Sequence, residues 1–498
     1  MKQFLIIPLG GLGSRFEREG YKTYKPFLPI SSKLRIIDNI ISNFPQKDTH
    51  VILIANNKKY NFIKLNFKRK NTTIIKINNH KFGPMYSLFL AIDKIKRVVK
   101  KNSFYVSYSD INWKWDFKKV DKIKLKKKII VFSHKGFHPH LETDEKSDFF
   151  LCNKNSEIKR VSEKKTIKKD YKKNYLAIGC YYFESLRYFE FFFNLSFFKK
   201  PYLKKEIYLI NFLKYCLKRK IKINHYLIDK FVHLGTPSQY ENFLQWKKFY
   251  SEAPKKSLKL NLPGLMLMAG QGKRVKNLRE KKPFLQIRKY KAYEFIFNKF
   301  GSSKKIIVVN RNFYKSIEKK YKLLKIEKTN SMFETVENSL SLIKDLKNFF
   351  IHSCDCFGLF NKKRFINFLK NKKPDVVLFA FNISNLQRKL SNAHTTIRFK
   401  NNSIYSINIK KLLNRSNELG HAGFFWISSK KVFDHVKNFH KTKKFNREIL
   451  LDDYFKFLFD KKLCTIKCFR LDQYIHFGSI PEYFELKYWE NFFKNDNL

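Results

Sequence analysis

The sequence is poor in the features that mark secreted and membrane proteins. Its 498 residues contain only seven cysteines, an odd number scattered along the chain, so a disulfide framework is not expected. The densest apolar stretch, 188–198, is interrupted by Glu190 and Asn194 and is too short to span a bilayer. No signal peptide is expected, because apolar Phe4–Leu9 leads directly into glycines and charges. We therefore predict a soluble cytoplasmic protein.

Acidic residues are also scarce, with 41 Asp and Glu against 104 Lys and Arg, which gives a formal net charge of +63. Such a charge is typical of nucleic-acid and membrane-surface binders. However, 43% of the residues are hydrophobic and 17% aromatic, which excludes a disordered polycation. Glycine (16) and proline (13) are few, while Lys, Asn, Ile, Phe and Tyr abound, as in a genome poor in G and C. Arg, the preferred residue for bidentate phosphate and base contacts, is not enriched, so nucleic acid is not the expected partner.

Two halves of the chain carry the same landmarks in the same order, which indicates an internal repeat. Each half opens with an apolar run, a glycine loop and a Lys-Pro-Phe-Leu segment. The paired landmarks are Arg15 with Arg274, Lys25 with Lys282, Asn56 with Asn310, Ser87 with Ser339, Asp110 with Asp355, Gly179 with Gly423, and Gly235 with Gly478. The offset within these pairs shrinks steadily along the chain. We predict a tandem duplication: a first domain at 1–250, a linker at 251–262 and a second domain at 263–498.

Each half alternates β-branched runs with helix-like segments, so we predict an α/β fold with a mostly parallel sheet in each domain. The expected strands of the first half are 3–7, 51–55, 73–77, 104–107 and 128–132; those of the second are 264–268, 305–309, 348–352 and 376–380. Ligands of such sheets bind beyond the carboxyl ends of the strands. Asp110 and Asp355 both directly follow a predicted strand.

The glycine loop after Leu9 suits a phosphate group. It is not a dinucleotide fingerprint, because Phe16 and Val275 stand at the third glycine position, and no P-loop is present. Glycines still let backbone N–H groups approach an anion, and nearby cations add charge. The first half offers Gly10, Gly11, Gly13, Arg15 and Lys25, and the second offers Gly270, Gly272, Arg274 and Lys282. A tight turn beside solvated cations is the alternative, but the recurrence in both halves favours phosphate binding.

These motifs resemble the sugar-1-phosphate nucleotidyltransferases, also called nucleotide-sugar pyrophosphorylases. The resemblance covers essentially all of the first half and rests on Gly10–Phe16 followed by Lys25–Leu28, Gly83–Ser87, Ser107–Asp110, Glu163-Lys164, Ile178–Phe183 and Leu234–Pro237. Each motif is weak singly and specific in combination. Within the family, the segments 20–26 and 136–140 look most like capsule and cell-envelope members. The resemblance implies two tandem Rossmann-like domains of the nucleotide-diphospho-sugar transferase type.

The resemblance also implies a reaction and a set of roles. The reaction would be the Mg²⁺-dependent transfer of a nucleotidyl group from an NTP to a sugar-1-phosphate or similar small phosphorylated acceptor, with release of pyrophosphate. Its role would be capsule or cell-surface polysaccharide biosynthesis. In this assignment Asp110 holds Mg²⁺, with Asp355 as its counterpart. Triphosphate and base would be bound by Leu9, Gly10, Gly11, Gly13, Arg15, Lys25 and Gly83, and the acceptor by Glu163, Lys164 and Gly179.

The sequence departs from the family at the second metal ligand. Many members have an aspartate two residues before the closing glycine, where this chain has His233 and His476. Either Asp229 (with Asp472 in the second half) takes its place, or the metal has a single protein carboxylate. His134, His138 and His140 lack a carboxylate at ligand spacing and are expected in the acceptor loop or on the surface.

The second half is more divergent. It keeps the nucleotide-side residues, but Thr335 stands at the Gly83 position and Lys410 lacks a preceding glutamate. It is either a second transferase with another acceptor or a degenerate half kept for packing or regulation, and the loss of acceptor-side residues favours an impaired site.

A different class stays open for the chain as a whole: a basic RNA- or anionic-surface-binding protein built on a decayed nucleotidyltransferase fold. Its best candidate surfaces are the lysine-rich segments 118–128 and 164–173. These segments are more simply explained as charged residues exposed to solvent.

Overall fold

The chain folds into two compact units, 1–244 and 245–498. The computed structural model describes residues 3–11, 13–45, 47–124, 127–143, 146–195, 198, 205–252, 258–270, 278, 280–311, 314–343, 346–383, 395–400, 403–411, 418–442 and 446–494. The division falls inside helix α8 (Pro237–Glu252), slightly before the boundary expected at 250. Part of the expected linker is packed, because the backbone N–H groups of Leu258 and Leu260 donate to the carbonyls of Lys299 and Phe300.

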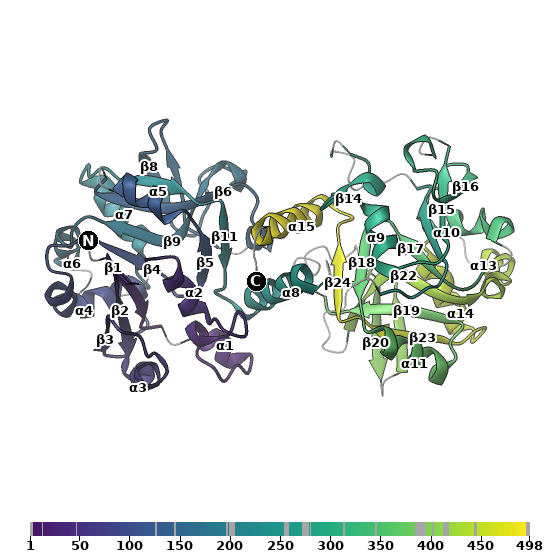
Figure 1. Ribbon diagram of the computed structural model, residues 1–498, viewed down its shortest axis with the longest axis horizontal. Helices are drawn as coiled ribbons and strands as arrows, with labels where there is room; N and C mark the ends of the chain where they lie inside the picture. The colour runs from purple at the N-terminus through teal and green to yellow at the C-terminus, as the bar shows by residue number, and fades with distance from the viewer. Residues whose placement is uncertain are drawn as a thin grey trace. The chain divides into compact units, whose positions relative to one another are not determined.

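The first unit is built on a mixed nine-stranded sheet (Figure 1). Seven strands follow the order β10-β6-β9-β4-β1-β2-β3, and a β7–β8 hairpin is attached through β9. The neighbours β1, β2, β3 and β4 pair in parallel, whereas β9 is antiparallel to both β4 and β6. The bounds are β1 Gln3–Leu9, β2 Thr49–Asn56, β3 Thr72–Ile77, β4 Phe104–Ser107, β6 Ile129–Lys135, β7 Phe149–Cys152, β8 Ile158–Ser162, β9 Tyr175–Phe183 and β10 Asn224–Leu227.

The second unit has the same architecture. Its nine-stranded sheet follows the order β23-β19-β22-β17-β12-β15-β16, with β20 and β21 attached through β22. Each strand has a counterpart in the first unit, and each pairing has the same direction. The bounds are β12 Gly264–Met268, β15 Lys305–Asn310, β16 Lys322–Ile326, β17 Lys347–Ser353, β19 Val376–Phe381, β20 Thr396–Lys400, β21 Ser403–Asn408, β22 Glu418–Ser429 and β23 Ile466–Arg470. This identity of strand order supports the hypothesis of a duplication.

Helices cover both faces of each sheet, which is why the central strands read as continuous apolar runs. Every residue of β1, β12 and β19 is buried. The helices of the first unit are α1 Ser14–Arg18, α2 Ile36–Ser42, α3 Asn57–Asn66, α4 Pro84–Val99, α5 Phe117–Lys124, α6 Arg187–Phe193, α7 Leu209–Lys218 and α8. One apolar core joins α4, α6 and α7 to the sheet.

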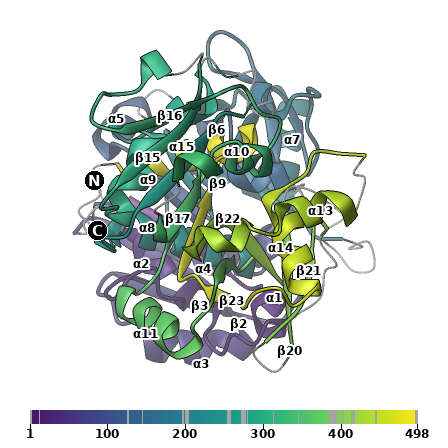
Figure 2. The same ribbon diagram turned by 90° about the vertical axis from the view of Figure 1, so that its right-hand side faces the viewer.

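In the second unit, α10 (Met332–Glu337), α13 (Val436–Thr442) and α14 (Leu451–Asp460) share a core with the sheet. Figure 2 shows β17 and β22 of this unit with α13 and α14 to one side and α11 (Lys362–Lys372) to the other. The remaining helices are α9 Ala292–Phe300 and α15 Ile480–Phe493.

Two small features recur in both units and position the site. A 3₁₀ turn carries the Lys-Pro-Phe segment: η1 (Lys25–Phe27) and η6 (Lys282–Phe284). A separate two-stranded antiparallel ribbon follows the central strand: β5 (Ile111–Lys114) with β11 (Lys230–His233), and β18 (Cys356–Leu359) with β24 (Gln473–His476).

The predicted α/β class with mostly parallel sheets is confirmed, and each predicted strand overlaps an observed one. Within the part of the chain that the structure describes, every helix is too short or too polar to cross a membrane.

Candidate functional site

The candidate site of the first unit centres on Asp110, at the turn between β4 and β5. Its carboxylate Oδ2 accepts a hydrogen bond from Nζ of Lys25 at 3.0 Å, although the two residues lie far apart in the sequence. The ribbon of β5 and β11 pairs Ile111 with His233, whose Nε2 lies 3.9 Å from Oδ1 of Asp110. The backbone N–H of Leu234 donates to the Asp110 carbonyl at 2.6 Å and closes this turn. Lys25, Asp110 and His233 therefore form one cluster.

The charges of this cluster are set by its surroundings. Burial raises the pKa of the Asp110 carboxyl, but the charge and hydrogen bond of Lys25, together with His233, lower the pKa to about 2. Burial lowers the pKa of His233, and the charges of Lys25 and Arg15 act in the same direction, against that of Asp110. At neutral pH the cluster is thus a carboxylate beside an ammonium group and a neutral imidazole.

The Asp110 carboxylate fits a magnesium ion. Its Oδ1 atom is buried and has no hydrogen-bond partner among the described residues. Such an unpaired carboxylate oxygen is costly unless a cation or ligand meets it. Mg²⁺ is often held by one or two carboxylates, with waters and substrate phosphates completing its shell. Within the described ranges no group of three His, Cys, Asp or Glu side chains could hold a metal by itself, so Asp110 would be its protein carboxylate.

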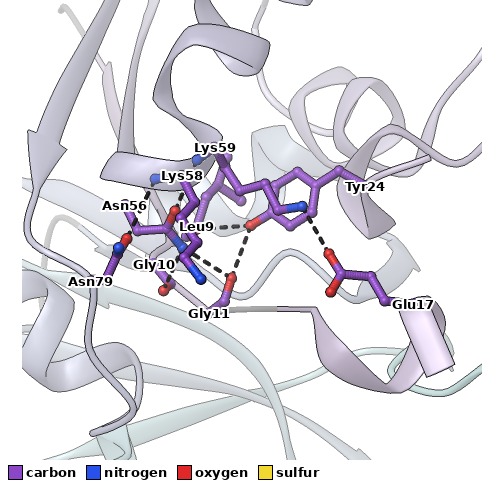
Figure 3. A network of polar contacts seen from close by, with 9 residues as sticks. All are labelled: Leu9, Gly10, Gly11, Glu17, Tyr24, Asn56, Lys58, Lys59 and Asn79. Carbon is purple, nitrogen blue, oxygen red and sulfur yellow. Dashed lines mark hydrogen bonds and ion pairs between the residues drawn. The ribbon is translucent and has the colours of Figure 1, made fainter. Parts of the chain in front are cut away.

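The glycine loop after β1 is tied to this cluster through Tyr24, the residue before Lys25 (Figure 3). The Tyr24 hydroxyl donates to the carbonyls of Leu9 at 2.8 Å and Gly11 at 3.4 Å. From the end of β2, Nδ2 of Asn56 donates to the carbonyls of Gly10 at 3.0 Å and Gly11 at 3.4 Å. The loop is thereby fixed at the carboxyl ends of β1 and β2. Parallel sheets place their ligands at this edge.

Small residues in and near the loop allow close packing. Gly13 has a φ of 74° and caps α1, in which Arg15 is exposed, and the charge of Arg15 acts on His233. A Cβ on Gly10 would lie 2.3 Å from Oγ of Ser87 in α4. Gly83, with a φ of 83°, caps α4 and would place a Cβ 2.7 Å from the Ile207 carbonyl. Loop and helix start therefore meet without intervening side chains.

The expected acceptor-side residues gather around the start of α7. Nζ of Lys164 lies 3.1 Å from the Tyr208 hydroxyl and 4.3 Å from the centre of its ring. Oε2 of Glu163 accepts from Nδ2 of Asn211 at 2.8 Å. Because Gly179 lacks a side chain, Tyr108 packs against it: a Cβ there would lie 2.8 Å from the Tyr108 ring.

Tyr108 connects this acceptor region to Asp110. Its hydroxyl accepts from the backbone N–H of Leu209 at 3.1 Å, at the start of α7, and Asp110 follows two residues later in the chain. The same region contains Asp148, whose pKa is raised to about 6, chiefly by burial.

Asp229 is not part of the cluster, which corrects the suggestion that it completes the metal site. It precedes β11 at the end opposite His233, and the extended chain between them spans about 13 Å. His138 and His140, expected in the acceptor loop or on the surface, are only 1% and 6% exposed. The His138 ring lies edge-on to the rings of His134 and His140, so these residues belong to the interior of the unit.

The second unit repeats the cluster with Lys282, Asp355 and His476. Nζ of Lys282 pairs with Oδ2 of Asp355, and Nε2 of His476 lies 3.3 Å from the same oxygen. Gly270 lies beside these residues in a cavity of about 440 Å³. Gly272 and Arg274, also expected there, lie outside the described residues. The cap of α10 is Ser331, whereas sequence spacing had placed Thr335 at the position of the Gly83 cap.

Residues 5–242 match a family model described as nucleotidyl transferase, just under half of the chain. The first unit is therefore similar to nucleotidyl transferases over nearly its whole length. The match ends where the first unit ends, and it contains Lys25, Asp110 and His233. No curated protein matches the chain in sequence.

Several solved structures resemble about half of the chain. A nucleoside-diphosphate-sugar pyrophosphorylase from Vibrio cholerae RC9 is 16% identical, covers 48% of this chain and 99% of its own, and gives a TM-score of 0.38. The inositol-1-phosphate CTP transferase from T. maritima is 15% identical over 48% of this chain and 99% of its own, with a TM-score of 0.36. A UDP-glucose pyrophosphorylase from Acinetobacter baumannii is 13% identical over 51% and 95%, with a TM-score of 0.38. At these values the likeness says nothing about substrates.

Sequence reasoning missed the residues that support the candidate site. Asn56 was noted only as a repeat landmark, yet it holds the glycine loop, and Asn310 does the same in the second unit by donating to the Ala269 carbonyl at 3.2 Å. Recurrence of an asparagine at the same strand end was the available signal. No sequence signal pointed to Tyr24 or Tyr108, because their hydroxyl partners are backbone groups of distant segments.

Proposed function

We propose that the first unit transfers a nucleotidyl group from an NTP to a sugar-1-phosphate or similar small phosphorylated acceptor, with Mg²⁺ and release of pyrophosphate. The observation that carries this proposal is the Asp110 carboxylate, which binds Lys25 through Oδ2, while its Oδ1 has no hydrogen-bond partner among the described residues. The cluster stands at the strand edge where the glycine loop ends, inside the segment that matches the nucleotidyl transferase family. A cytoplasmic enzyme of capsule or cell-surface polysaccharide synthesis is the role we propose.

The reaction needs positioning and charge more than covalent work by the protein. A phosphate oxygen of the acceptor attacks the α-phosphorus and forms a new P–O bond. The bond from the α-phosphorus to the oxygen that bridges to the β-phosphate breaks, and that oxygen leaves on pyrophosphate with the electron pair. The acceptor phosphate is already ionised near neutral pH, so no general base is required. Bound Mg²⁺ would supply charge neutralisation and orient the phosphates.

The residues of the cluster have distinct roles in this proposal. Asp110 would hold the metal through Oδ1, while Lys25, fixed by Oδ2, presents its remaining N–H groups to the α-phosphate. Arg15 and the loop 10–13 would hold the leaving pyrophosphate. Since these donors are fixed before the substrate arrives, little reorganisation opposes the reaction.

The acceptor would be bound between the end of β8 and the start of α7. Lys164, against the Tyr208 ring, is placed for a phosphate, and Glu163, held by Asn211, for a hydroxyl or amine. Lys164 has a φ of 52°, a left-handed backbone conformation, two residues after the end of β8.

The test is pyrophosphate release by the full chain with Mg²⁺, each of the four NTPs and a panel of sugar-1-phosphates. Asp110→Asn should lower turnover by about a thousandfold, as expected when the ligand of a catalytic cation is lost. Asp116→Asn is the matched control, because this exposed carboxylate caps α5 and asparagine also caps helices.

Two results would contradict the proposal. One is undiminished turnover of the Asp110→Asn chain. The other is a wild-type chain that releases no pyrophosphate from any NTP but binds RNA tightly at physiological salt, which would favour the RNA-binding alternative.

A further inference from the structure

In the second unit, both oxygens of the carboxylate that corresponds to Asp110 are engaged by the chain itself. Oδ1 of Asp355 accepts from Oγ of Ser353, and Oδ2 is shared by Nζ of Lys282 and Nε2 of His476. Its side chain is 4% exposed, compared with 22% for Asp110. A magnesium ion binds carboxylate oxygens together with several waters, which need open space and a free lone pair. Asp355 therefore does not fit the metal that its sequence position suggested.

The two units differ at one residue that lies next to the histidine, and this residue changes the histidine's partners. Both histidines are followed by a helix whose third residue faces them: Gln239 in α8 and Glu482 in α15. Gln239 accepts from the backbone N–H groups of Gly235 and Thr236, whereas Oε2 of Glu482 pairs with Nδ1 of His476 at 2.7 Å. Glu482 thus ties His476 between two carboxylates, and His476 is 7% exposed against 37% for His233.

The same unit nevertheless has a cavity of suitable size for a ligand. About 440 Å³ lies within the usual range of small-molecule sites. Two lysines line it, Lys282 and Lys410. Lys410 has a φ of 45° and so repeats the unusual backbone conformation of Lys164 at the corresponding turn. An ammonium group has three donors, so Lys282 retains N–H groups for an anion while it binds Asp355.

The cavity also has a polar pair that the first unit lacks. Nδ1 of His421 lies 2.7 Å from Oδ1 of Asp452, and both residues line the cavity. By strand register and helix position their counterparts are Ala177 and Ile210. His421 is 4% exposed, and its Nε2 has no hydrogen-bond partner among the described residues. A buried, unpaired nitrogen in a cavity wall is explained when a ligand or water completes its bond.

We propose that this cavity is a binding site for a phosphorylated small molecule that needs no divalent metal ion. Lys282 and Lys410 meet the phosphate, and the side of the cavity with His421 and Asp452 takes hydroxyl or amine groups of the same molecule. The network of Lys282, Asp355, His476 and Glu482 fills the place of the ion. This inference rests on the proposed function in one respect: both assume that a phosphate binds at the carboxyl ends of the strands.

Metal stoichiometry is the first test, and it does not depend on turnover. Protein-bound Mn²⁺ is counted by electron paramagnetic resonance on the full chain with inorganic pyrophosphate. We expect one ion per chain, none for Asp110→Asn and one for Asp355→Asn. Two ions per wild-type chain, or an ion lost in Asp355→Asn but kept in Asp110→Asn, would overturn the proposal. An Asp110→Asn chain that keeps its turnover refutes the proposed function instead.

Anion binding is the second test. In an Arg15→Ala/Lys25→Ala/Lys164→Ala background, which removes the three first-unit cations that the proposed function assigns to phosphates, calorimetry measures pyrophosphate binding in Mg²⁺ and in EDTA. We expect one site whose Kd agrees within about twofold in the two conditions and rises about tenfold with Lys410→Ala, the loss of one charge-assisted contact. Lys437→Ala, an exposed lysine of α13 outside the cavity lining, is the control. Binding that requires Mg²⁺, absence of binding, or an unchanged Kd in the Lys410 variant contradicts the inference.

Discussion

The two units have the same strand order, the same Lys-Pro-Phe turn and the same Asp–His arrangement, yet their aspartates are in opposite situations. Asp110 is partly open, and within the described part of the chain its Oδ1 accepts no hydrogen bond, whereas Asp355 is closed in by Ser353, Lys282 and His476. The landmark residue is thus the same, and its partners decide what it can bind. A carboxylate with a spare oxygen attracts a cation from solution, and one saturated by internal donors is a structural element.

Replacing the lysine of the Lys-Pro-Phe turn should give the largest difference in turnover between the two units. Lys25→Ala should reduce turnover by about a hundred- to a thousandfold, since the proposed function gives this fixed cation the role of stabilising the transition state. Lys282→Ala should affect turnover less and instead lower the melting temperature, because the buried Asp355 loses a charged partner. Steady-state kinetics and thermal denaturation of both variants give the comparison, with the exposed Lys33→Ala as control. Equal losses of turnover in the two variants would mean that both units take part in catalysis.

A smaller effect on turnover is expected when Gln239 of the first unit is replaced by glutamate, the residue at the corresponding position of the second unit. Gln239→Glu keeps an acceptor for Gly235 and Thr236 but adds a negative charge beside His233, which raises the pKa of the imidazole. The protonated ring then competes for Oδ1 of Asp110, so the Mg²⁺ concentration for half-maximal turnover should rise about tenfold. Gln245→Glu, an exposed position of the same helix, is the control. An unchanged Mg²⁺ requirement would show that this residue does not separate the two units.

The smallest expected effect is on stability against pH. Burial alone would lower the pKa of His476, but Glu482 and Asp355 raise it to about 9, above the ordinary value of 6.5. A histidine with a raised pKa in the folded state contributes stability that is complete below about pH 6.5 and is lost as the pH rises through about 9. The melting temperature should therefore fall over this range, by about 2–4 °C for each kcal/mol lost. Asp110 behaves in the opposite way, because its lowered pKa contributes stability above its ordinary value of 3.8, which is lost as the pH falls toward 2.

Thermal denaturation of the wild type and of Glu482→Gln at several pH values checks this prediction. The variant should be less stable at neutral pH and should depend less on pH between 6.5 and 9. Parallel curves for the two proteins would show that the Glu482–His476 pair does not set the pH dependence. Glu490→Gln, on the same helix and paired with Lys487, serves as control.

Much of the fold could be predicted because buried parallel strands leave a strong sequence signal. The runs that became β1, β2, β12 and β15 are continuously apolar, and glycine loops follow β1 and β12. Asp110 and Lys25 could be proposed from their motifs alone, and they lie within hydrogen-bond distance. Asp229 was placed wrongly because its spacing from Gly235 was considered without the intervening strand, which separates it from the cluster.

The amino-acid sequence by itself determined the α/β class, the expected strands, the recurrence of landmarks and the residue types proposed to bind a phosphate. These follow from local patterns and from spacing along the chain. Only the tertiary structure decided which partners reach the oxygens of each aspartate, because Lys25, Lys282 and the two histidines come from distant segments of the chain. A hydrogen bond acts over about 3 Å, so its partners are fixed by how the segments fold together and not by their order in the sequence.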